Sequence, residues 1–439
     1  MLRPLDPAER MADRFDRAFT LNFATVARVR GPLTQAQLQH ALRCLELRHP
    51  LLRTAIVRSA GELSFAPGQA AAIPLIVEDL SHEEAHERIQ SSIDHCVWSD
   101  EGPRAELSWL RHGEQRSSLI LRMHHVVGDG SSGMIAMRDL LDFFTHRELE
   151  AVVPLDSPGQ ESFMPTSHAH TRQQFFETVQ THRPPRPAPA LRLSSFDGSP
   201  VDARRTQLRR IQLSVAESAA LAAHARRDGA TVHGVLCGAF AQSVAQEGGS
   251  ATNLQRVAHP VDLRRHLREL DPNGTPIGDA VGYYVSGITT QHAVDSAQPL
   301  GELACAITKA VRAAKAAGEP LMATPLRGPY FVERTQDMSL EAFRDLAEQK
   351  IFTDTFALTN LGPLEHLGAS QRVGALEVED LFFVAASSVN NQLGGSAVSF
   401  AGRIALQLIG VAPLIPAAML DRLTERTRAR LLAYAGRAG

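Results

Sequence analysis

The chain has 439 residues, which is enough for two or three domains with cores of their own. Hydrophobic residues make up 44% and charged residues 21%, a balance that excludes a disordered, collagen-like or coiled-coil protein. The 45 Lys and Arg nearly match the 48 Asp and Glu, so no overall positive charge attracts nucleic acid or an anionic membrane. We expect a folded protein that binds a small molecule, or a partner through a local patch.

The cysteines and the termini indicate the compartment. The four cysteines lie far apart and form no CxxC pair, which argues against a zinc ribbon and against a disulfide framework. The N-terminal segment is interrupted by charges and lacks the apolar run of a signal peptide. The most apolar stretch, residues 404–420, contains two prolines and is too irregular to span a membrane. We therefore expect a cytoplasmic protein without integral membrane association, and a monomer.

In the first half of the chain, apolar alternation predicts strands, and helix formers behind a Ser or Thr predict helices. The expected strands are residues 22–29, 51–57, 107–110 and 118–123, and the expected helices are residues 34–47, behind Thr34, and a helical stripe that starts at Ser132. Ser131 and Ser132 are interpreted as caps of this second helix.

Residues 183–200 are rich in Pro and small polar residues, as in an interdomain linker. Beyond them, the same patterns predict strands at 207–213, 257, 281–288, 353–360, 379–386 and 396–409, and helices at 215–226, 232–244, 299–316 and 415–435. Both halves therefore mix helices and strands, which predicts an α/β (α+β) fold with mixed sheets. The predicted domains are residues 1–182 and 205–439, joined by a linker at 183–204, and we expect the substrate site at their interface.

The clearest chemical signal is the segment RMHHVVGDGSSG, residues 122–133, where a strand runs into a turn and then into a helix. Neighbouring strand residues point to opposite faces, so only one of His124 and His125 can face a given cleft. His125 is the candidate general base, because a neutral imidazole can take a proton from a hydroxyl or an amine. Asp129 either aims this imidazole or pairs with an arginine, and Gly128 and Gly130 would permit a sharp turn.

Residues 124–130, HHVVGDG, match the HHxxxDG motif, and the sequence resembles the chloramphenicol-acetyltransferase-like acyltransferase superfamily. This superfamily includes nonribosomal peptide condensation domains, mycobacterial polyketide-associated acyltransferases, wax ester synthases and plant acyltransferases. Further segments agree in order along the whole chain: RHPLLRT at 48–54, HPVDLRRHL at 259–267, VGYYVSG at 281–287 and LTNLGPLE at 358–365. The DFGWG motif of the plant-type branch is absent, which favours the bacterial branches.

The resemblance implies two chloramphenicol-acetyltransferase-like domains with an active-site channel at their interface. It also implies that His125 is the catalytic base and that Asp129 is structural and bonded to an arginine, for which we select Arg264. His124 and Gly130 then belong to the structural part of the motif. Asn360 is expected to orient substrate or the developing oxyanion.

The predicted activity is therefore acyl transfer of the EC 2.3.1 type, direct and without a covalent acyl-enzyme, from an acyl-CoA or acyl carrier protein thioester to a small-molecule alcohol. An amine acceptor is the less favoured variant. No permanently bound cofactor is expected, and the donor supplies the phosphopantetheine thioester. Basic residues at Arg204-Arg205 and at Lys309-Arg312-Lys315 are candidates to hold a carrier's acidic helix or the CoA phosphates; the alternative is a solvated face.

Three other functions remain open at this point. The first is a free-standing condensation enzyme that joins carrier-bound partners through an amide or an ester. The second is a non-catalytic binding relative, although the histidine motif is intact here. The third is a zinc peptidase, because residues 82–86 fit HExxH, but they follow a predicted Ser81 cap on a strongly charged, solvated helix without a clear third ligand. We therefore predict no metal site.

Overall fold

The computed structural model resolves the chain into two compact units. Unit 1 comprises Met1–Phe163, Leu267–Tyr284 and Leu361–Ala386, and unit 2 comprises Met164–His266, Val285–Asn360 and Ser387–Gly439. The residues that the structure describes are 3–59, 61–67, 70–94, 98–145, 149, 152–163, 173, 177, 190–194, 199–249, 252–270, 277–322, 324, 327–385 and 393–436. Cys96 and half of the predicted linker at 183–204 lie outside these residues.

Unit 1 is built on a six-stranded sheet of order β12-β13-β2-β7-β6-β5 and a small antiparallel sheet of order β1-β4-β3. Its strands are β1 (Arg3–Pro4), β2 (Asn22–Arg30), β3 (Thr54–Ser59), β4 (Glu62–Pro67), β5 (Leu75–Asp79), β6 (Ala105–Arg111), β7 (Arg116–His124), β12 (Arg372–Val373) and β13 (Leu376–Ala385). Its helices are α1 (Pro7–Ala18), α2 (Gln35–Arg48), α3 (His82–Asp94) and α4 (Gly130–Asp142), with short 3-10 turns η1 (Pro50–Arg53), η2 (His125–Val127), η4 (Gln160–Phe163) and η8 (Leu364–Leu367).

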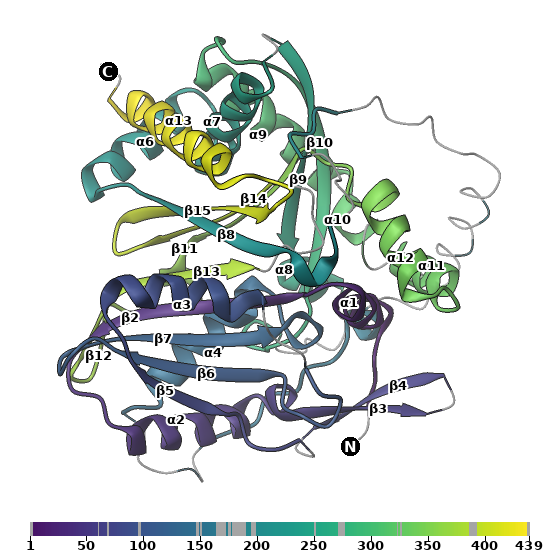
Figure 1. Ribbon diagram of the computed structural model, residues 1–439, viewed down its shortest axis with the longest axis vertical. Coiled ribbons are helices and arrows are strands. Elements are labelled where there is room, and N and C mark those ends of the chain that lie inside the picture. Colours follow the sequence, from purple (N-terminus) through teal and green to yellow (C-terminus); the bar gives the residue numbers. More distant parts are fainter. Residues whose placement is uncertain are drawn as a thin grey trace. The chain divides into compact units, whose positions relative to one another are not determined.

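Strand β13 comes from late in the chain yet pairs antiparallel with β2, with Phe382 opposite Val26 (Figure 1). On its other side β2 pairs with β7, so that Asn22 lies opposite His124. The compact units therefore do not follow the chain as two uninterrupted halves, because two segments of the second half complete unit 1. The division at 1–182 and 205–439 stays a prediction.

Unit 2 is built on a six-stranded sheet of order β10-β9-β11-β14-β15-β8. Its strands are β8 (Arg205–Gln212), β9 (Thr252–Asp262), β10 (Val285–Asp295), β11 (Phe356–Pro363), β14 (Leu393–Phe400) and β15 (Arg403–Ala412). Its helices are α6 (Val215–Arg227), α7 (Val232–Glu247), α9 (Leu300–Ala316), α10 (Glu319–Leu321), α11 (Arg327–Thr335), α12 (Leu340–Leu346) and α13 (Ala417–Ala435), with short turns η5 (Val201–Ala203) and η7 (Ala347–Ile351). Helix α8 (Arg264–Leu270) begins in unit 2 and ends in unit 1.

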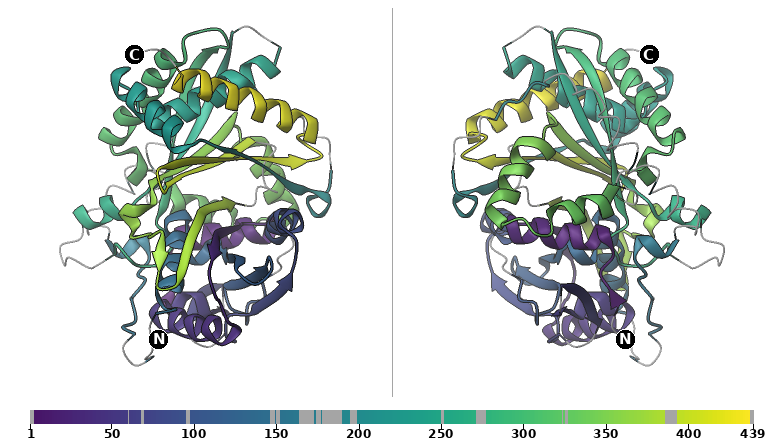
Figure 2. Two further views of the ribbon diagram at one scale, coloured as in Figure 1. Left: turned by 90° about the vertical axis from the view of Figure 1, so that its left-hand side faces the viewer. Right: turned by 90° about the vertical axis from the view of Figure 1, so that its right-hand side faces the viewer.

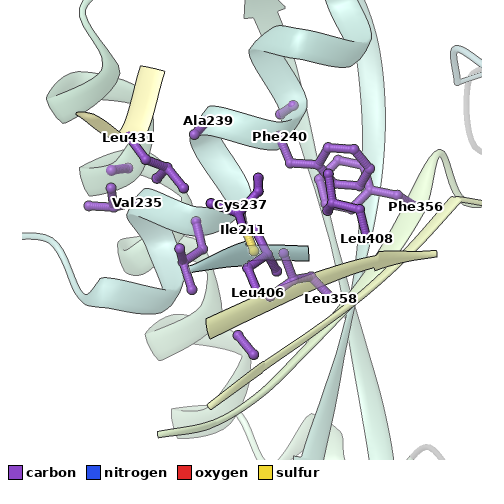
Figure 3. Packing of buried hydrophobic residues seen from close by; sticks show 14 of the residues in the cluster. Ile211, Val235, Cys237, Ala239, Phe240, Phe356, Leu358, Leu406, Leu408 and Leu431 are labelled. Carbon is purple, nitrogen blue, oxygen red and sulfur yellow. The ribbon is translucent and has the colours of Figure 1, made fainter. Parts of the chain in front are cut away.

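Helices α6, α7, α9 and α13 lie over the sheet of unit 2, and α13 packs against the other three helices (Figures 1 and 2). An apolar core lies beneath them, in which Phe240 of α7 packs on Phe356 of β11 with the rings tilted by 56° and their centroids 4.7 Å apart (Figure 3). Burial of such side chains contributes about 25 cal/mol per Å² of apolar surface, which makes this core the main source of stability for the unit.

Local capping explains where several helices begin. Thr34, as predicted, caps α2, and its hydroxyl accepts from the Gln37 amide while the Gln37 side chain accepts from Thr34 in return. Ser214 and Glu217 form the same reciprocal box on α6. The mixed α/β fold is confirmed. The strand predicted at 51–57 is wrong in its first part, because the 3-10 turn η1 precedes β3, and the strand predicted at 281–288 begins only at Val285.

Candidate active site

The segment with the two histidines is displayed at the end of β7, which is a central strand of the unit 1 sheet. The chain leaves β7 at His124, makes the short turn η2, and enters α4 at Gly130. Helix α4 begins immediately after the turn and packs on β2, β7 and β13. The turn is therefore held between strand β7 and helix α4. A loop held in this way by rigid elements is a suitable place for a reactive group.

His125 has one ring nitrogen committed to the backbone. Its Nδ1 lies 2.8 Å from the Gly128 carbonyl oxygen, and because a carbonyl only accepts, the proton of the neutral ring is on Nδ1. The lone pair of Nε2 is then available, and no hydrogen bond to Nε2 is formed by the described residues. Desolvation by burial lowers the pKa of His125 below 6.5, although the Asp129 charge acts in the opposite direction. At neutral pH the ring is therefore uncharged and can accept a proton at Nε2.

Two aromatic rings flank this imidazole. Phe23 of β2 lies 5.0 Å from it, measured between ring centroids, and Tyr283 lies 5.6 Å from it in an edge-on arrangement. Burial, together with the charge of Asp129, raises the pKa of the Tyr283 phenol, so this ring stays neutral. Neither aromatic residue was singled out from the sequence as a neighbour of the histidine, although Tyr283 lies in the VGYYVSG segment.

His124 is oriented away from this position and is almost fully buried. Its Nδ1 accepts from the Val126 amide at 2.8 Å, and its Nε2 lies 3.1 Å from Asp16 Oδ2 of α1. The ring edge also contacts Trp98, with centroids 5.9 Å apart. Both ring nitrogens are thus engaged, which fits the packing role that the sequence predicts for His124 and leaves His125 as the residue with a usable lone pair.

Asp129 ties three parts of unit 1 together. Its Oδ1 accepts from the Ser132 amide at 2.8 Å and so caps α4, while its Oδ2 accepts from the Tyr284 amide at 2.9 Å. Tyr284 in turn donates its hydroxyl to the Pro158 carbonyl at 2.7 Å. The buried carboxylate therefore fixes the start of the helix and holds the 277–284 segment beside the histidine turn.

The structure corrects the prediction that Ser131 and Ser132 are helix caps. The helix begins earlier, at Gly130, and Asp129 is the cap. Ser132 is fully buried in the first turn; its hydroxyl donates to the Gly282 carbonyl at 2.8 Å and accepts from the Gly282 amide at 3.1 Å. Ser132 thus adds a second link between α4 and the segment that carries Tyr283.

The glycines of the motif are needed for space rather than for a left-handed turn. Gly128 is extended, with φ of −173°, so the predicted sharp turn is not found there. A Cβ on Gly128 would lie 2.8 Å from Met123 Cε, and one on Gly133 would lie 2.4 Å from Thr25 Oγ1. A Cβ on Gly130 would lie 3.3 Å from the Phe383 ring of β13. Larger residues would push the turn off the sheet beneath it.

The RHPLLRT segment supports α4 from the other side. His49 is fully buried, and its Nε2 lies 2.8 Å from Asp139 Oδ2 on α4. Arg138 Nε donates to the other oxygen of Asp139 at 2.8 Å. Burial disfavours the Asp139 charge, but these two partners hold the pKa of Asp139 below its usual value. The sequence indicated a family motif here and gave no sign that it fixes the helix behind the histidine turn.

Three comparisons relate the chain to known proteins. The family described as Phthiocerol/phthiodiolone dimycocerosyl transferase C-terminus matches residues 202–412. Chondramide synthase of Chondromyces crocatus is 29% identical over 380 residues, which are 80% of this chain and 9% of that protein. The chain thus spans less than a tenth of this curated relative.

Solved structures share the fold over nearly the whole chain. Polyketide synthase associated protein 5 from Mycobacterium tuberculosis superposes with a TM-score of 0.67 at 16% identity, covering 99% of this chain and 98% of that one. Trichothecene 15-O-acetyltransferase from Fusarium sporotrichioides superposes with a TM-score of 0.70 at 12% identity, covering 99% and 95%. These structures share the fold of the chain, and the family match at residues 202–412 agrees with the resemblance of the sequence to chloramphenicol-acetyltransferase-like acyltransferases. The predicted two-part mixed fold is thereby confirmed.

Two residues selected for this superfamily's site lie in unit 2. Arg264, at the start of α8, is buried, and its Nη1 lies 3.2 Å from each oxygen of Asp262. Asn360 is half-buried and lies inside β11, not in the turn that follows it. The contact of Arg264 with Asp129 and the substrate-orienting role of Asn360 stay predictions, as does the channel between the two domains.

The HExxH pattern and Arg204 also have defined positions in the structure. The HExxH residues begin α3, where Ser81 forms the predicted cap by accepting from the Glu84 amide at 3.2 Å, and Glu83, Glu84 and His86 are exposed. Arg204 is buried against Glu348 at 2.5 Å, so the expectation that it lies on a basic rim is wrong. Within the described ranges, no helix is both long and apolar enough to cross a membrane.

Proposed function

We propose that this chain is an acyltransferase that moves an acyl group from a CoA or carrier-protein thioester to an acceptor hydroxyl, forming an ester. The observation that supports this most strongly is the His125 ring. Its Nδ1 proton is held by the Gly128 carbonyl, its Nε2 lone pair is available, and its pKa lies below the usual value because it is desolvated. Such a ring is a general base at neutral pH.

The transfer needs only this one base. Nε2 of His125 takes the acceptor's hydroxyl proton as the oxygen attacks the thioester carbonyl carbon, which gives a tetrahedral oxyanion. The oxyanion collapses, the carbon–sulfur bond breaks, and the imidazolium returns its proton to the departing thiolate. No covalent acyl-enzyme and no permanently bound cofactor are required, because the donor brings its own phosphopantetheine thioester.

Other residues have supporting roles in this proposal. Asn360 is assigned to orient the acceptor or the developing oxyanion. A neutral hydrogen-bond donor stabilises an oxyanion most strongly where water is excluded. Asp129 and Arg264 are assigned to holding the loop and the 277–284 segment, and they do not exchange protons with substrate. His124 keeps the turn in place through its contacts with the Val126 amide and Asp16. Gly130 is small enough to lie beside the Phe383 ring.

A second candidate is a condensation enzyme that joins carrier-bound partners. Two observations favour a carrier protein as partner: the similarity to chondramide synthase over 80% of the chain, and three exposed cations on α9, namely Lys309, Arg312 and Lys315. Carrier proteins present acidic helices, and exposed basic residues steer such partners to a site. In this reading the chemistry of His125 is unchanged, and only the donor and acceptor differ.

The deciding experiment measures thiol release from acyl-CoAs of increasing chain length and from acylated carrier proteins. Each donor is tested with and without mixed alcohols and amines. We expect release that depends on acceptor in the wild type and is lost in His125→Ala. The matched control is His86→Ala, on the exposed face of α3, which also removes a histidine of the HExxH pattern and should leave activity unchanged.

The outcomes separate the candidates. Equal turnover in wild type and folded His125→Ala would overturn the mechanism. Release from acylated carriers that an aminoacyl carrier protein stimulates but small-molecule alcohols and amines do not, and that weakens when Lys309, Arg312 and Lys315 are changed to Glu, would support the condensation enzyme. Failure with every donor would leave a binding module.

A further inference from the structure

Unit 2 holds a buried cluster of three potential metal ligands. His233 and Cys237 lie one turn apart on α7, and His259 lies on the adjacent strand β9. His233 Nε2 lies 2.8 Å from His259 Nδ1, and Cys237 Sγ lies 3.5 Å from His233 Nε2 and 4.0 Å from His259 Nδ1. In the part of the chain that the structure describes, this is the one group of at least three His, Cys, Asp or Glu with ligand atoms within 4.8 Å of one another.

The spacing of these atoms suits a tetrahedral zinc ion. With Zn–N bonds of about 2.0–2.1 Å and Zn–S bonds of about 2.3 Å, two ligand nitrogens lie about 3.3 Å apart and a nitrogen and a sulfur about 3.6 Å apart. The triangle of Nε2, Nδ1 and Sγ reaches these separations after shifts of about half an ångström. We propose that His233, Cys237 and His259 bind one Zn²⁺, with water at the fourth position on the side of half-buried His233.

The hydrogen bonds around His259 are compatible with the tautomer that a metal ligand needs. Its Nε2 lies 2.8 Å from Thr290 Oγ1, and Thr290 Oγ1 lies 2.8 Å from His292 Nε2. If His259 Nε2 donates to Thr290, the Thr290 hydroxyl donates to His292, and Nδ1 of His259 keeps its lone pair toward the cluster. A second partner of this kind orients a metal-binding imidazole and makes it a better ligand.

Metal binding to the cluster releases one proton. Without metal, His233 Nε2–H donates to His259 Nδ1. On binding, the His233 proton moves to Nδ1 of the same ring, and Cys237 loses its thiol proton to solvent, so one proton is released for each Zn²⁺ bound.

The surrounding charges favour neutral imidazoles. Burial lowers the pKa of His233 to about 4 and that of His259 to about 3. The charge of Lys315 acts in the same direction on both rings, and His233 and His292 act in this direction on His259. Protons therefore do not compete with a metal for these rings at neutral pH. Burial also raises the pKa of the Cys237 thiol, which stays protonated until a metal replaces its proton. The thiolate formed in this way offsets part of the repulsion between Lys315 and the ion.

The cluster would act as a structural clamp. Cys237 lies among the apolar side chains of the unit 2 core, near Ile211 and Leu406 (Figure 3). A zinc ion would join helix α7 to strand β9 at the edge of this core, where the two elements already pack. The sequence predicts no metal site because His259 lies 22 residues beyond Cys237, and only the fold brings it beside the HxxxC pair.

The test uses the full chain, stripped of metal with a chelator and kept reduced, and titrated with Co²⁺ and then with Zn²⁺. We expect one Co²⁺ per chain, bound with release of one proton and with a thiolate-to-cobalt charge-transfer band and tetrahedral visible bands, and then displaced by one Zn²⁺ without further proton release. Cys237→Ser should abolish the charge-transfer band. His233→Asn, at a half-buried position that tolerates change, should weaken zinc binding more than about 100-fold, beyond the about 10–100-fold cost of losing a supporting partner.

The chain contains a matched control. His40 and Cys44 on α2 form another pair at the same spacing, with Cys44 Sγ also 3.5 Å from a histidine Nε2, but they belong to no cluster of three among the described residues. Cys44→Ser should keep the band and the affinity. Absence of a charge-transfer band in the wild type, or its loss in Cys44→Ser and retention in Cys237→Ser and His233→Asn, would overturn the proposal.

Discussion

Each unit contains a close pair of histidines, and the two pairs differ in how their ring nitrogens are used. His124 and His125 are neighbours in sequence but point apart: the first has both nitrogens engaged, and the second keeps one lone pair available. His233 and His259 are 26 residues apart, yet their nitrogens converge to 2.8 Å. A single available lone pair suits proton transfer, whereas ring nitrogens that converge beside a thiol suit a metal ion. The surroundings of a histidine, more than its position in a motif, determine its chemistry.

The largest expected effect is on catalysis and concerns only one of the two pairs. We expect His125→Ala to lower kcat/KM by about 10²–10⁴-fold, the usual contribution of a general base. The midpoint of urea unfolding should change little, because the ring is half-buried and has one backbone partner. Steady-state kinetics and urea titrations on the same sample measure both quantities.

His233→Asn is the control for this comparison, and it should retain the wild-type kcat/KM. If His233→Asn reduced turnover as strongly as His125→Ala, the two histidine pairs would not be functionally separate.

The next effect is on the stability of the histidine turn. Asp129→Ala removes the cap of α4 and leaves the Tyr284 amide without its acceptor, so we expect a loss of about 2–4 kcal/mol in the free energy of unfolding. Asp129→Asn keeps an oxygen for the cap but places an amide group against the Tyr284 amide, so it should lose about half as much. Urea unfolding followed by circular dichroism measures both variants. Equal stability of Asp129→Ala and wild type would contradict the structural role.

How much of this site the sequence predicts depends on whether a contact is local. His125 and Asp129 could be selected because the motif itself carries the chemistry, although the sequence placed the helix cap at Ser131 and Ser132 and not at Asp129. The Tyr284 amide, the Gly282 contacts of Ser132 and the His49 bond to Asp139 could not, because each joins segments separated by 90 residues or more. Sequence periodicity says which face of a helix is buried, but not which distant backbone it meets.

The third expected effect is a loss of stability in acid, and it concerns His233 and His259. His233 and His259 have folded-state pKa values of about 4 and 3, below the unfolded value of about 6.5. Their neutral forms therefore favour folding fully above pH 6.5, and this contribution is lost as pH falls from 6.5 toward the folded-state values. At pH 5 we expect a loss of about 2 kcal/mol per histidine in metal-free protein.

Urea unfolding in the presence of a chelator, between pH 7.5 and pH 5, measures this loss. Cys237, His292 and Lys315 face the same cluster, so the comparison is made with His259→Gln, whose stability should depend less steeply on pH. A slope equal to that of the wild type would show that His259 does not carry the effect.

The smallest effect is on the pH dependence of the rate. His125 must be neutral to accept a proton, so kcat/KM should rise with pH along a single limb whose apparent pKa lies below 6.5. Between pH 5.5 and pH 7.5 the change should therefore be smaller than about tenfold. A limb centred above pH 6.5 would mean that the base is not the desolvated ring of His125.

For the fold, regular patterns were predicted well and irregular ones poorly. Helices α2, α6, α7, α9 and α13 follow their predicted ranges closely because each has a cap or a long apolar stripe. The turn η1 was read as the start of a strand because its Leu-Leu pair is apolar in either structure. Strand β13 was expected near its true position, but nothing in its residues showed that it pairs with β2, which is more than 300 residues earlier in the chain.

That pairing has a consequence for biosynthesis. On the ribosome, β2, β7, β6 and β5 emerge early, but the partner of β2 on its other side, β13, follows only when residues 376–385 have been made. Until then β2 is an edge strand with unsatisfied backbone groups, the kind of surface on which nascent chains aggregate. A gene cut between the two halves would make that transient exposure permanent, so exchange of parts between relatives of this protein should keep β2 and β13 from the same parent.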